Sequence, residues 1–440
     1  MAKDIQGLGL GLASKFAGSQ FAEKYKLRKS AEKMAYLSTK TGFKMAGELL
    51  KRANNKKKVD NNMLLPAPAK KNVLFDLSLT EEQQMIKDTV RAYTTDVIRD
   101  LALDADENKA LPQDYLTNLM DIGLNYFSVP EALGGAAQSY SPTTSAIIAE
   151  ELAWGDMGLA YAALAPTAVA NAIVRWGTAE QKKNYLPRYL EETPVKAAIA
   201  VQEAHPLFDA NKLSCSAKKT KKGYLINGQK TLVPFAGDAD LYLVAAMLKG
   251  KPAVFIVPGK SAGIHFKKVP AMGLRGATTG QLTLKNVELA SDALLGSEGF
   301  SASPSNYQEF IDLGQLHWCA LAIGTAQAAL DYVITYCNER EAFGEPISHR
   351  QSVAFLIADI GIELDAMRLL TWRAAALAEE GKSFHREAFL AHTLCAEKAM
   401  KIGTDAVQLL GGHGFTKEHP AERWYRDLRV LACNTSGMHL

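Results

Sequence analysis

The region from Gly324 to Phe415 constrains the fold more than any other part of the chain. Apolar residues recur in it at helical spacing in three successive segments, which end near Cys337, Leu364 and Leu409. Short breaks at Phe343-Gly-Glu-Pro346 and at Gly411-Gly412 separate or end these segments. Long helices joined by short breaks pack side by side, so the sequence predicts an antiparallel helical bundle.

Two short motifs in this region predict what the bundle binds. Arg340 follows the first helical segment, and its planar guanidinium can hold a diphosphate through two parallel hydrogen bonds. The pair Gly411-Gly412 lets the backbone approach a phosphate or a ribose closely. Either feature alone is common, because a helix-terminal arginine is usually solvated and a glycine pair usually ends a helix.

The combination is more specific. Arg340-x-x-Phe-Gly-x-x-Ile, Gln351 eleven positions after the arginine, and Gln-Leu-Leu-Gly-Gly-x-Gly-Phe ending at Phe415 resemble the C-terminal bundle of the acyl-CoA dehydrogenase family. The resemblance extends from about Leu77 to Asp427. It implies that Arg340 and Gln351 hold the diphosphate of an FAD bound to a neighbouring subunit, with Phe343, Gly411 and Gly412 at the same cofactor.

The resemblance and the sequence pattern together predict a mainly α fold with a central β domain. Thr80-Glu-Glu-Gln83 has the spacing of a helix-capping box, and short β-branched or alternating segments begin at Ala197. The expected strands are 197–201, 212–217, 224–233, 241–248, 253–257 and 281–289, forming a small barrel or sandwich. The expected regions are a basic helical extension (1–53), a linker (54–74), an N-terminal α domain (75–196), a middle β domain (197–303) and a C-terminal four-helix bundle (304–440).

The catalytic base of the family is missing at both of its known positions. Members of the family carry a glutamate either near the C-terminus or on the helix before the arginine motif, and the matching positions here hold Thr435 and Gly314. Gln315 stands where an arginine is usual, close to the substrate. The nearby acids Glu309 and Asp312 have other helical offsets, so we expect them to be solvated. His205 and His439 are candidate replacements, and the chain ends at Leu440, so we expect the family's last helix to be absent.

The wall of the flavin site departs from the family as well. The segment that matches Thr-Glu-x-Gly-x-Gly-Ser-Asp begins at Gln202, whose amide can hydrogen-bond the flavin, and has Phe208 in place of the serine. Pro234 replaces a threonine and offers neither a hydroxyl nor a backbone donor. By resemblance, the helix around Glu150 lines the acyl pocket, so Glu150, Phe208 and Gln315 are the expected substrate residues, while Gln202 and Pro234 contact the cofactor.

Four functions remain open. The first is an acyl-CoA dehydrogenase that uses FAD and an unusual active site; the second is a non-catalytic or half-site subunit that holds the FAD of an active homologous partner. A flavin monooxygenase on the same scaffold and a membrane-docking scaffold protein are the others. The expected partners are acyl-CoA and other chains, in a homo- or hetero-oligomeric dimer or dimer of dimers, and no nucleic acid.

The charge distribution sets the first part of the chain apart. Residues 1–71 contain 16 Lys or Arg against 5 Asp or Glu, whereas the whole chain has a net charge of only +3. Such a basic, amphipathic segment predicts contact with a lipid surface or with a partner protein. No apolar run approaches 18 residues, which argues against a spanning helix. Five scattered cysteines show no metal spacing and fit a reducing, cytoplasmic location. Residues 1–53 suggest that the protein associates with a membrane from that compartment.

Overall fold

A computed structural model describes residues 78–433, except 126–127, 136–139 and 206–207. All of these residues belong to one compact unit, Phe75–Leu440. The basic extension (1–53), the linker (54–74), Thr435 and His439 lie outside the described residues.

The N-terminal part is a block of helices. The capping box is confirmed: the Thr80 hydroxyl accepts a hydrogen bond from the Gln83 N–H, and the Gln83 side chain accepts one from the Thr80 N–H. The elements are α4 (Glu81–Tyr93), the π-helix η1 (Thr94–Ile98), α5 (Arg99–Asn108), α6 (Tyr115–Asp121), η3 (Glu131–Leu133), α7 (Pro142–Gly155), α8 (Met157–Trp176), α9 (Ala179–Tyr185) and η4 (Leu186–Leu190).

Helix α8 runs through the interior of this block. Asp156 caps its first turn by accepting a hydrogen bond from the Leu159 N–H. By length and composition α8 could cross a membrane, and no other helix in the described part of the chain meets that test. Because 67% of the 18-residue apolar stretch of α8 is buried inside the protein, we interpret α8 as a core helix.

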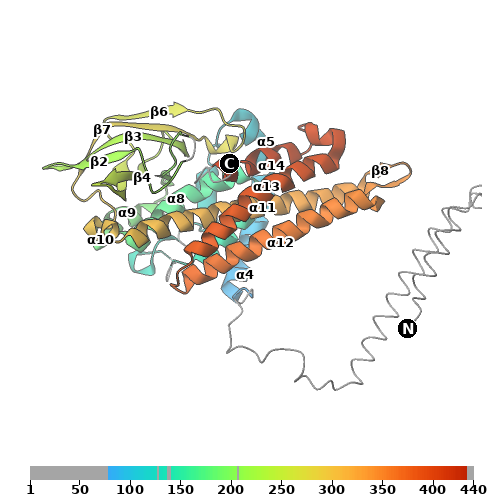
Figure 1. The fold of residues 1–440 in the computed structure, drawn as a ribbon, viewed down its shortest axis with the longest axis horizontal. Coiled ribbons are helices and arrows are strands. Elements are labelled where there is room, and N and C mark those ends of the chain that lie inside the picture. The colour runs from blue at the N-terminus through green and yellow to red at the C-terminus, as the bar shows by residue number, and fades with distance from the viewer. Residues whose placement is uncertain (1–77, 126–127, 136–139, 206–207, 434–440) are drawn as a thin grey trace, which may run out of the picture. The chain divides into compact units, whose positions relative to one another are not determined.

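A single curled sheet of seven strands follows (Figure 1). Its order is β1-β4-β2-β3-β7-β6, with β5 paired to the other edge of β4. Both β1 and β2 run parallel to β4, and the remaining pairs are antiparallel. The strands are β1 (Ala197–Ala200), β2 (Ser216–Lys219), β3 (Gly223–Val233), β4 (Leu241–Leu248), β5 (Lys251–Pro258), β6 (Ile264–Lys268) and β7 (Gly280–Ala290).

The strand predictions fail at two places, each for a physical reason. β2 begins at Ser216 rather than at Lys212, because the backbone N–H groups of Ser214 and Cys215 donate to the Glu203 carboxylate instead of to a neighbouring strand. β6 was not predicted at all. It is a mostly exposed strand at the end of the sheet and lacks the alternation of buried and exposed residues that marks a strand in sequence.

The C-terminal part is the predicted helical bundle. Its long helices are α11 (Pro304–Glu339), α12 (Gln351–Glu379) and α13 (His385–Leu410), and they lie side by side in Figure 1. The smaller elements are α10 (Ser297–Ala302), the hairpin β8 (Glu341–Ala342) and β9 (Glu345–Pro346), η6 (Ile347–His349), η7 (Gly411–Phe415), α14 (Ala421–Leu428) and α15 (Val430–Cys433).

Close contact between α7 and α11 joins the first helical block to the bundle. A Cβ atom added to Gly324 would lie 2.1 Å from the Glu150 carbonyl oxygen, so only glycine permits this approach. One residue farther on, the Thr325 hydroxyl donates to the Ala153 carbonyl at 3.1 Å. These contacts fix α11 against α7 along one wall of the cavity described next.

Candidate functional site

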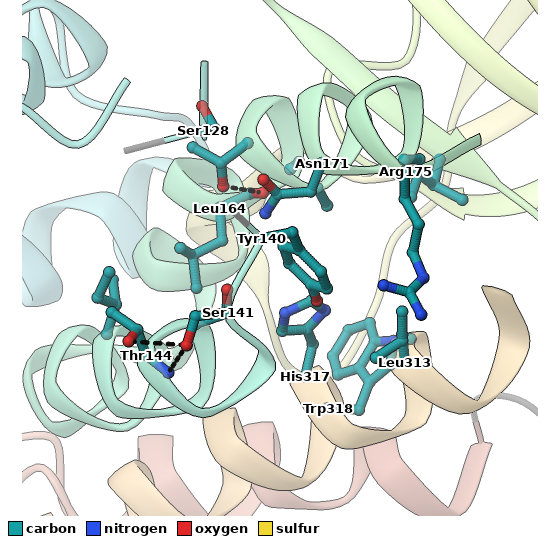
Figure 2. A pocket seen from close by; sticks show the side chains of 18 of the residues that line it. Ser128, Tyr140, Ser141, Thr144, Leu164, Asn171, Arg175, Leu313, His317 and Trp318 are labelled. Atoms are coloured by element: carbon teal, nitrogen blue, oxygen red, sulfur yellow. Dashed lines mark hydrogen bonds between the residues drawn. The ribbon is translucent and has the colours of Figure 1, made fainter. Parts of the chain in front are cut away.

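A cavity of about 590 Å³ lies between α7, α8, α11 and the sheet. Side chains at helical spacing on α8 (Leu164, Asn171 and Arg175 among them) face Leu313, His317 and Trp318 of α11 across it (Figure 2). Ser141 caps α7 by accepting a hydrogen bond from the Thr144 N–H, which places both side chains at the cavity wall. Its size is in the range of small-molecule sites.

The sheet forms one end of the cavity, and the residues there include Gln202, Thr231, Leu232 and Pro234. The Thr231 N–H donates to the Gln202 carbonyl at 2.9 Å, so the two segments that were predicted to wall the flavin are neighbours. A register shift in β3 after Lys230 puts Leu232 in the left-handed region, at φ 56°. The Tyr161 hydroxyl holds this bulge by donating to the Leu232 carbonyl at 3.1 Å.

A buried ion pair supports this end of the cavity. Lys230 Nζ lies 2.8 Å from Glu203 Oε1 and donates to the Val201 carbonyl at 2.9 Å. Burial alone would raise the pKa of Glu203, but the charge of Lys230 and the hydrogen bonds from Lys230, Cys215 and Ser214 lower it overall. The charged pair therefore fastens the segment after β1 to β3.

The position that carries a glutamate in part of the family lines the cavity. It is Gly314 on α11, and apart from the backbone of α11 itself no atom of a described residue would lie within 4 Å of a Cβ built there. A side chain at this position would thus project into open space. Leu313, beside it, lines the cavity too, whereas Gln315 is half-buried and does not.

The acids that precede Gly314 do not replace the missing carboxylate. Asp312 was expected to be solvated, and this was wrong: it is 2% exposed, because it accepts hydrogen bonds from Gln308 Nε2 and His385 Nδ1, both at 2.9 Å. Glu309 is ion-paired with Arg175 at the cavity edge. Among the described residues, three carboxylates line the cavity, Glu82, Glu131 and Glu379, and all three are solvent-exposed.

The sequence analysis missed His317. It lies three residues after Gly314, hence on the same face of α11, and it lines the cavity with Trp318, whose ring is 4.6 Å from that of Tyr161. Burial lowers the pKa of His317 to about 4, so the imidazole is neutral at physiological pH. The helical spacing from Gly314 could have identified it.

The residues predicted to bind the cofactor across subunits lie at the far end of the bundle. Arg340 ends α11, and its guanidinium makes no hydrogen bond or ion pair with any residue that the structure describes. The β8–β9 hairpin follows, and its tip residue Phe343 is 95% exposed. Gln351 begins α12 and is also exposed. In Figure 1 the hairpin is the outer tip of the α11–α12 pair.

The glycine pair reaches the same end of the bundle. Gly411 ends α13 with φ 58°, and in the part of the chain that the structure describes no atom lies within 4 Å of a Cβ added to Gly411 or Gly412. The Tyr336 hydroxyl, one helical turn before Arg340, lies 2.8 Å from His413 Nδ1 and 3.4 Å from the Leu410 carbonyl. This contact joins the end of α11 to the turn that contains the two glycines.

Like Gln315, the other two predicted substrate residues lie outside the cavity. Glu150 accepts hydrogen bonds from Trp372 Nε1 (2.6 Å) and Arg368 Nε (3.0 Å), beside a second cavity of about 320 Å³. The α7 residue that lines the acyl cavity near this position is Ile148, on another face of the helix. Burial raises the pKa of Glu150, against the opposing charge of Arg368. Phe208 packs in the hydrophobic core between the sheet and the helices. His205, a candidate base, pairs with Glu203 at 3.6 Å and does not line the cavity.

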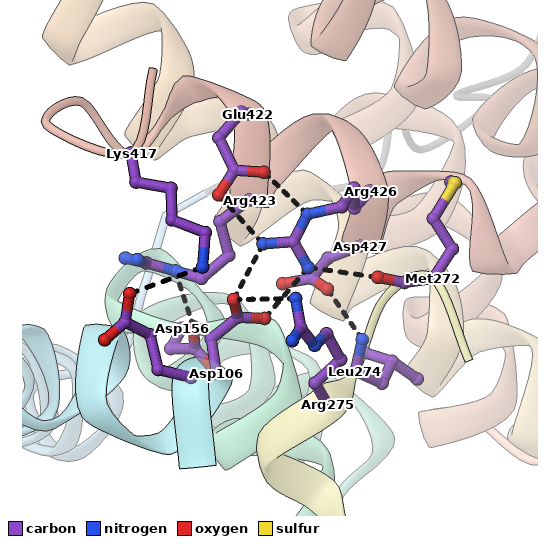
Figure 3. A network of polar contacts seen from close by, with 11 residues as sticks. Asp106, Asp156, Met272, Leu274, Arg275, Lys417, Glu422, Arg423, Arg426 and Asp427 are labelled. Carbon is purple, nitrogen blue, oxygen red and sulfur yellow. Dashed lines mark hydrogen bonds and ion pairs between the residues drawn. The ribbon is translucent and has the colours of Figure 1, made fainter. Parts of the chain in front are cut away.

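An ionic network links all three parts of the fold (Figure 3). Arg426 of α14 donates to Asp106 of α5 at 2.8 and 2.9 Å, and Arg275 from the β region reaches the same carboxylate at 3.4 Å. Asp427 accepts a hydrogen bond from the Leu274 N–H at 2.6 Å. Burial and, next, the charge of Asp156 raise the pKa of Asp427 to about 8.

Comparison with known proteins agrees with this architecture. Family models for the acyl-CoA dehydrogenase N-terminal, middle and C-terminal domains match residues 80–193, 198–287 and 305–434. The chain is 32% identical to cyclohex-1-ene-1-carbonyl-CoA dehydrogenase of Geobacter metallireducens, over 81% of this chain and 95% of that protein. It is 31% identical to the mitochondrial short-chain specific acyl-CoA dehydrogenase of Bos taurus, over 81% and 87%.

A solved structure shows the same fold. Butyryl-CoA dehydrogenase from Megasphaera elsdenii superposes with a TM-score of 0.76 at 28% identity, over 82% of this chain and 96% of that one. The helical block, the curled sheet and the bundle occur together in both chains. By its fold and by the match of all three domains, this chain belongs to the acyl-CoA dehydrogenase family, flavoproteins that oxidise acyl-CoA thioesters with FAD.

Proposed function

We propose that this chain contains an active site of its own, in which the cavity between α7, α8 and α11 holds the acyl group of an acyl-CoA for α,β-dehydrogenation. The main support for this proposal is the cavity itself, which has a volume of about 590 Å³ and is lined by α11 from Leu313 to Leu321. Its strand end is the predicted flavin wall, so an acyl chain inside it would lie beside the flavin. A subunit without substrate would not need this space.

Residues in two places, at the far end of the bundle and at the strand end of the cavity, fit FAD. Arg340 is a cation with no partner among the described residues, and it lies near a glycine pair with open space above it, a combination suited to a diphosphate. At the cavity, Gln202 and the β3 bulge provide polar backbone and side-chain groups. When bound, FAD supplies the acceptor for the hydride that leaves the β carbon.

The chain's own residues position the substrate and exclude water. Tyr161 and Trp318 cover the strand end of the cavity, and Leu164, Ile148 and Leu321 provide apolar wall. Excluding water lowers the local dielectric, which strengthens the hydrogen bonds that polarise the thioester carbonyl. The acyl group is thereby fixed with its α and β carbons against the flavin wall.

The FAD-binding residues at the bundle end are exposed, so they serve a cofactor shared with another chain. Three exposed apolar residues on α12 mark a face for that chain: Phe355 (64%), Ile362 (67%) and Leu369 (45%), spaced seven residues apart. Oligomers are usual in this family, and we propose at least a dimer here that packs along α12.

The half-site subunit is the second candidate, and Gly314 favours it, because no carboxylate occupies this cavity-lining position. Anaerobic titration of the purified protein with acyl-CoA decides between the two. If the chain has an active site of its own, FAD should be bound to it, and adding acyl-CoA should bleach the visible absorbance of the flavin. Bleaching that appears only after a co-purifying homologue is added would overturn the proposal in favour of the half-site reading.

The basic N-terminal segment, residues 1–53, adds no support to either candidate because it lies outside the described residues. Its contact with a lipid surface or with a partner protein, like a cytoplasmic location, stays a prediction.

A further inference from the structure

The missing carboxylate leaves a space on α11 that a neighbouring side chain can fill. No atom of another part of the described chain lies within 4 Å of a Cβ added to Gly314, and both Gly314 and His317 line the cavity. Residues three positions apart on a helix lie on the same face, so His317 and Gly314 are on the same side of α11. The imidazole therefore enters the same cavity that a glutamate at position 314 would enter, from one turn farther along the helix.

His317 is chemically free to act there. Its ring makes no hydrogen bond, ion pair or ring contact with any described residue, although it projects from α11 into the cavity opposite α8 (Figure 2). Burial is the cause of the lowered pKa, and no carboxylate of a described residue opposes it, so the ring presents an unprotonated nitrogen to the cavity at neutral pH. No other described histidine lines the cavity.

We propose that His317 is the base that removes the α proton of the acyl thioester, in place of the carboxylate that position 314 lacks. This inference rests on the proposed function, because it needs the thioester in the cavity between α8 and α11.

The step balances with the groups already named. The α C–H bond breaks, its proton goes to the imidazole nitrogen, and its electron pair becomes the second bond between the α and β carbons. The β C–H bond breaks at the same time, and its hydrogen leaves with the electron pair as hydride to FAD, which the family's reaction supplies. His317 ends as imidazolium, and loses the proton to solvent before the next turnover.

The charges formed in the reaction explain how a buried, weakly basic histidine can act as the base. Burial opposes a lone imidazolium, which is why the resting ring is neutral. With FAD bound at the strand end of the cavity, the negative charge delivered with the hydride would form near the imidazolium. In a medium of low dielectric two such opposite charges stabilise each other strongly, so the penalty falls when the proton moves.

The test separates proton removal from oxidation. The FAD-loaded full-length protein is mixed in D2O with a 3-thia-acyl-CoA, a thioester whose β carbon is replaced by sulfur and which has no β hydride to give. Exchange of its α protons for deuterium is followed by NMR. The variants are His317→Gln, the double variant His317→Ala/Gly314→Glu, and His265→Gln as a control at an exposed histidine of β6.

We expect His317→Gln to retain FAD and to bind the thioester while its exchange rate falls at least about 100-fold. The double variant should recover exchange, because the space beside Gly314 admits a glutamate at the family's alternative position. The His265→Gln control should exchange at the wild-type rate.

Two results would overturn the inference while leaving the cavity's role intact. One is a His317→Gln protein that holds FAD, binds the thioester and exchanges at the wild-type rate. The other is a wild-type protein that binds the thioester without exchanging it. Failure of the proposed function looks different, because the wild-type protein would then lack FAD or would not bind the thioester at all, and both proposals would fall.

Discussion

The Tyr336 hydroxyl lies 2.8 Å from Nδ1 of His413, 77 residues later in sequence, and so connects the arginine motif with the glycine pair. Tyr336 is one helical turn before Arg340, and His413 directly follows the glycine pair. Replacing Tyr336 with Phe removes this bond and keeps the ring. A hydrogen bond of this kind contributes about 1 kcal/mol, so we expect FAD to bind roughly 5-fold more weakly.

Flavin fluorescence titration of the apoprotein measures this change. Tyr332→Phe is a matched control, since Tyr332 lies one turn earlier on α11 and bonds His419 at 2.6 Å instead. An equal loss of FAD affinity in both variants would show that the Tyr336 bond has no specific part in the cofactor site.

Arg340 provides a stronger test of the same site. Because its guanidinium has no partner among the described residues, Arg340→Ala should leave the fold intact and remove charge-assisted hydrogen bonds to the diphosphate. Such bonds contribute about 1.5–3 kcal/mol, which corresponds to roughly a 10- to 100-fold loss of FAD affinity. The FAD affinity of Arg340→Lys should lie between those of the wild type and Arg340→Ala, because lysine keeps the charge and loses the planar guanidinium. Arg350→Ala is the control, since Arg350 is already paired with Glu345 at 2.9 Å; an FAD affinity unchanged in Arg340→Ala would contradict the assignment.

The apolar face of α12 predicts that assembly and flavin content change together. Ile362→Glu places a charge at the centre of the stripe between Phe355 and Leu369, so association with the second chain should weaken. Light scattering should show a smaller assembly, and the ratio of FAD to chain should fall. Met85→Glu, an equally exposed position on α4, should change neither. An Ile362→Glu protein that remains assembled like the wild type would exclude this face as the interface.

Sequence reasoning predicted the parts of the fold whose pattern is local. Helical spacing and the two motifs placed Arg340 and the glycine pair on one bundle, because a helix of known length brings its ends to defined positions. The exposed end strand β6 was missed, since its residues carry no burial pattern. The order of the strands depends on contacts between segments far apart in the chain, which no local pattern encodes.

The candidate site shows the same limit at the level of single residues. Glu150 was assigned to the acyl cavity because its helix lines it, but Ile148 faces the cavity and Glu150, two positions later, is rotated by about 200° around the helix axis. Adjacency in sequence therefore named the correct helix and the wrong face. For His317 the geometry was available, because three positions after Gly314 is the same face of the helix.

The buried pair of Glu203 and Lys230 should respond asymmetrically to mutation. Lys230→Met leaves a carboxylate buried without its partner, which costs about 3–5 kcal/mol in unfolding free energy. Adding Glu203→Gln in the same chain removes that charge, so the double variant should recover part of the loss. Chemical denaturation at a fixed FAD concentration measures both variants. Equal stability of the two would mean that the charge of Glu203 is not what makes the single variant unstable.

Asp427 should make the protein less stable as pH rises toward 8. Its folded pKa, raised to about 8 by burial, is well above the value of about 3.9 in an unfolded chain. Between these values the unfolded chain has released the proton and the folded chain keeps it, so the stabilisation is complete below pH 4 and is lost as pH rises through 8. The largest slope from one proton is about 1.4 kcal/mol per pH unit.

The variant Asp427→Asn tests this. It retains an oxygen to accept the hydrogen bond from the Leu274 N–H and cannot ionise. Its unfolding free energy, measured by denaturation at pH 5.5 and 7.5, should therefore fall less over this range than that of the wild type. Asp365→Asn, at an exposed carboxylate of α12, should keep the wild-type slope, and a wild-type slope in Asp427→Asn would mean that Asp427 is already ionised in the folded protein.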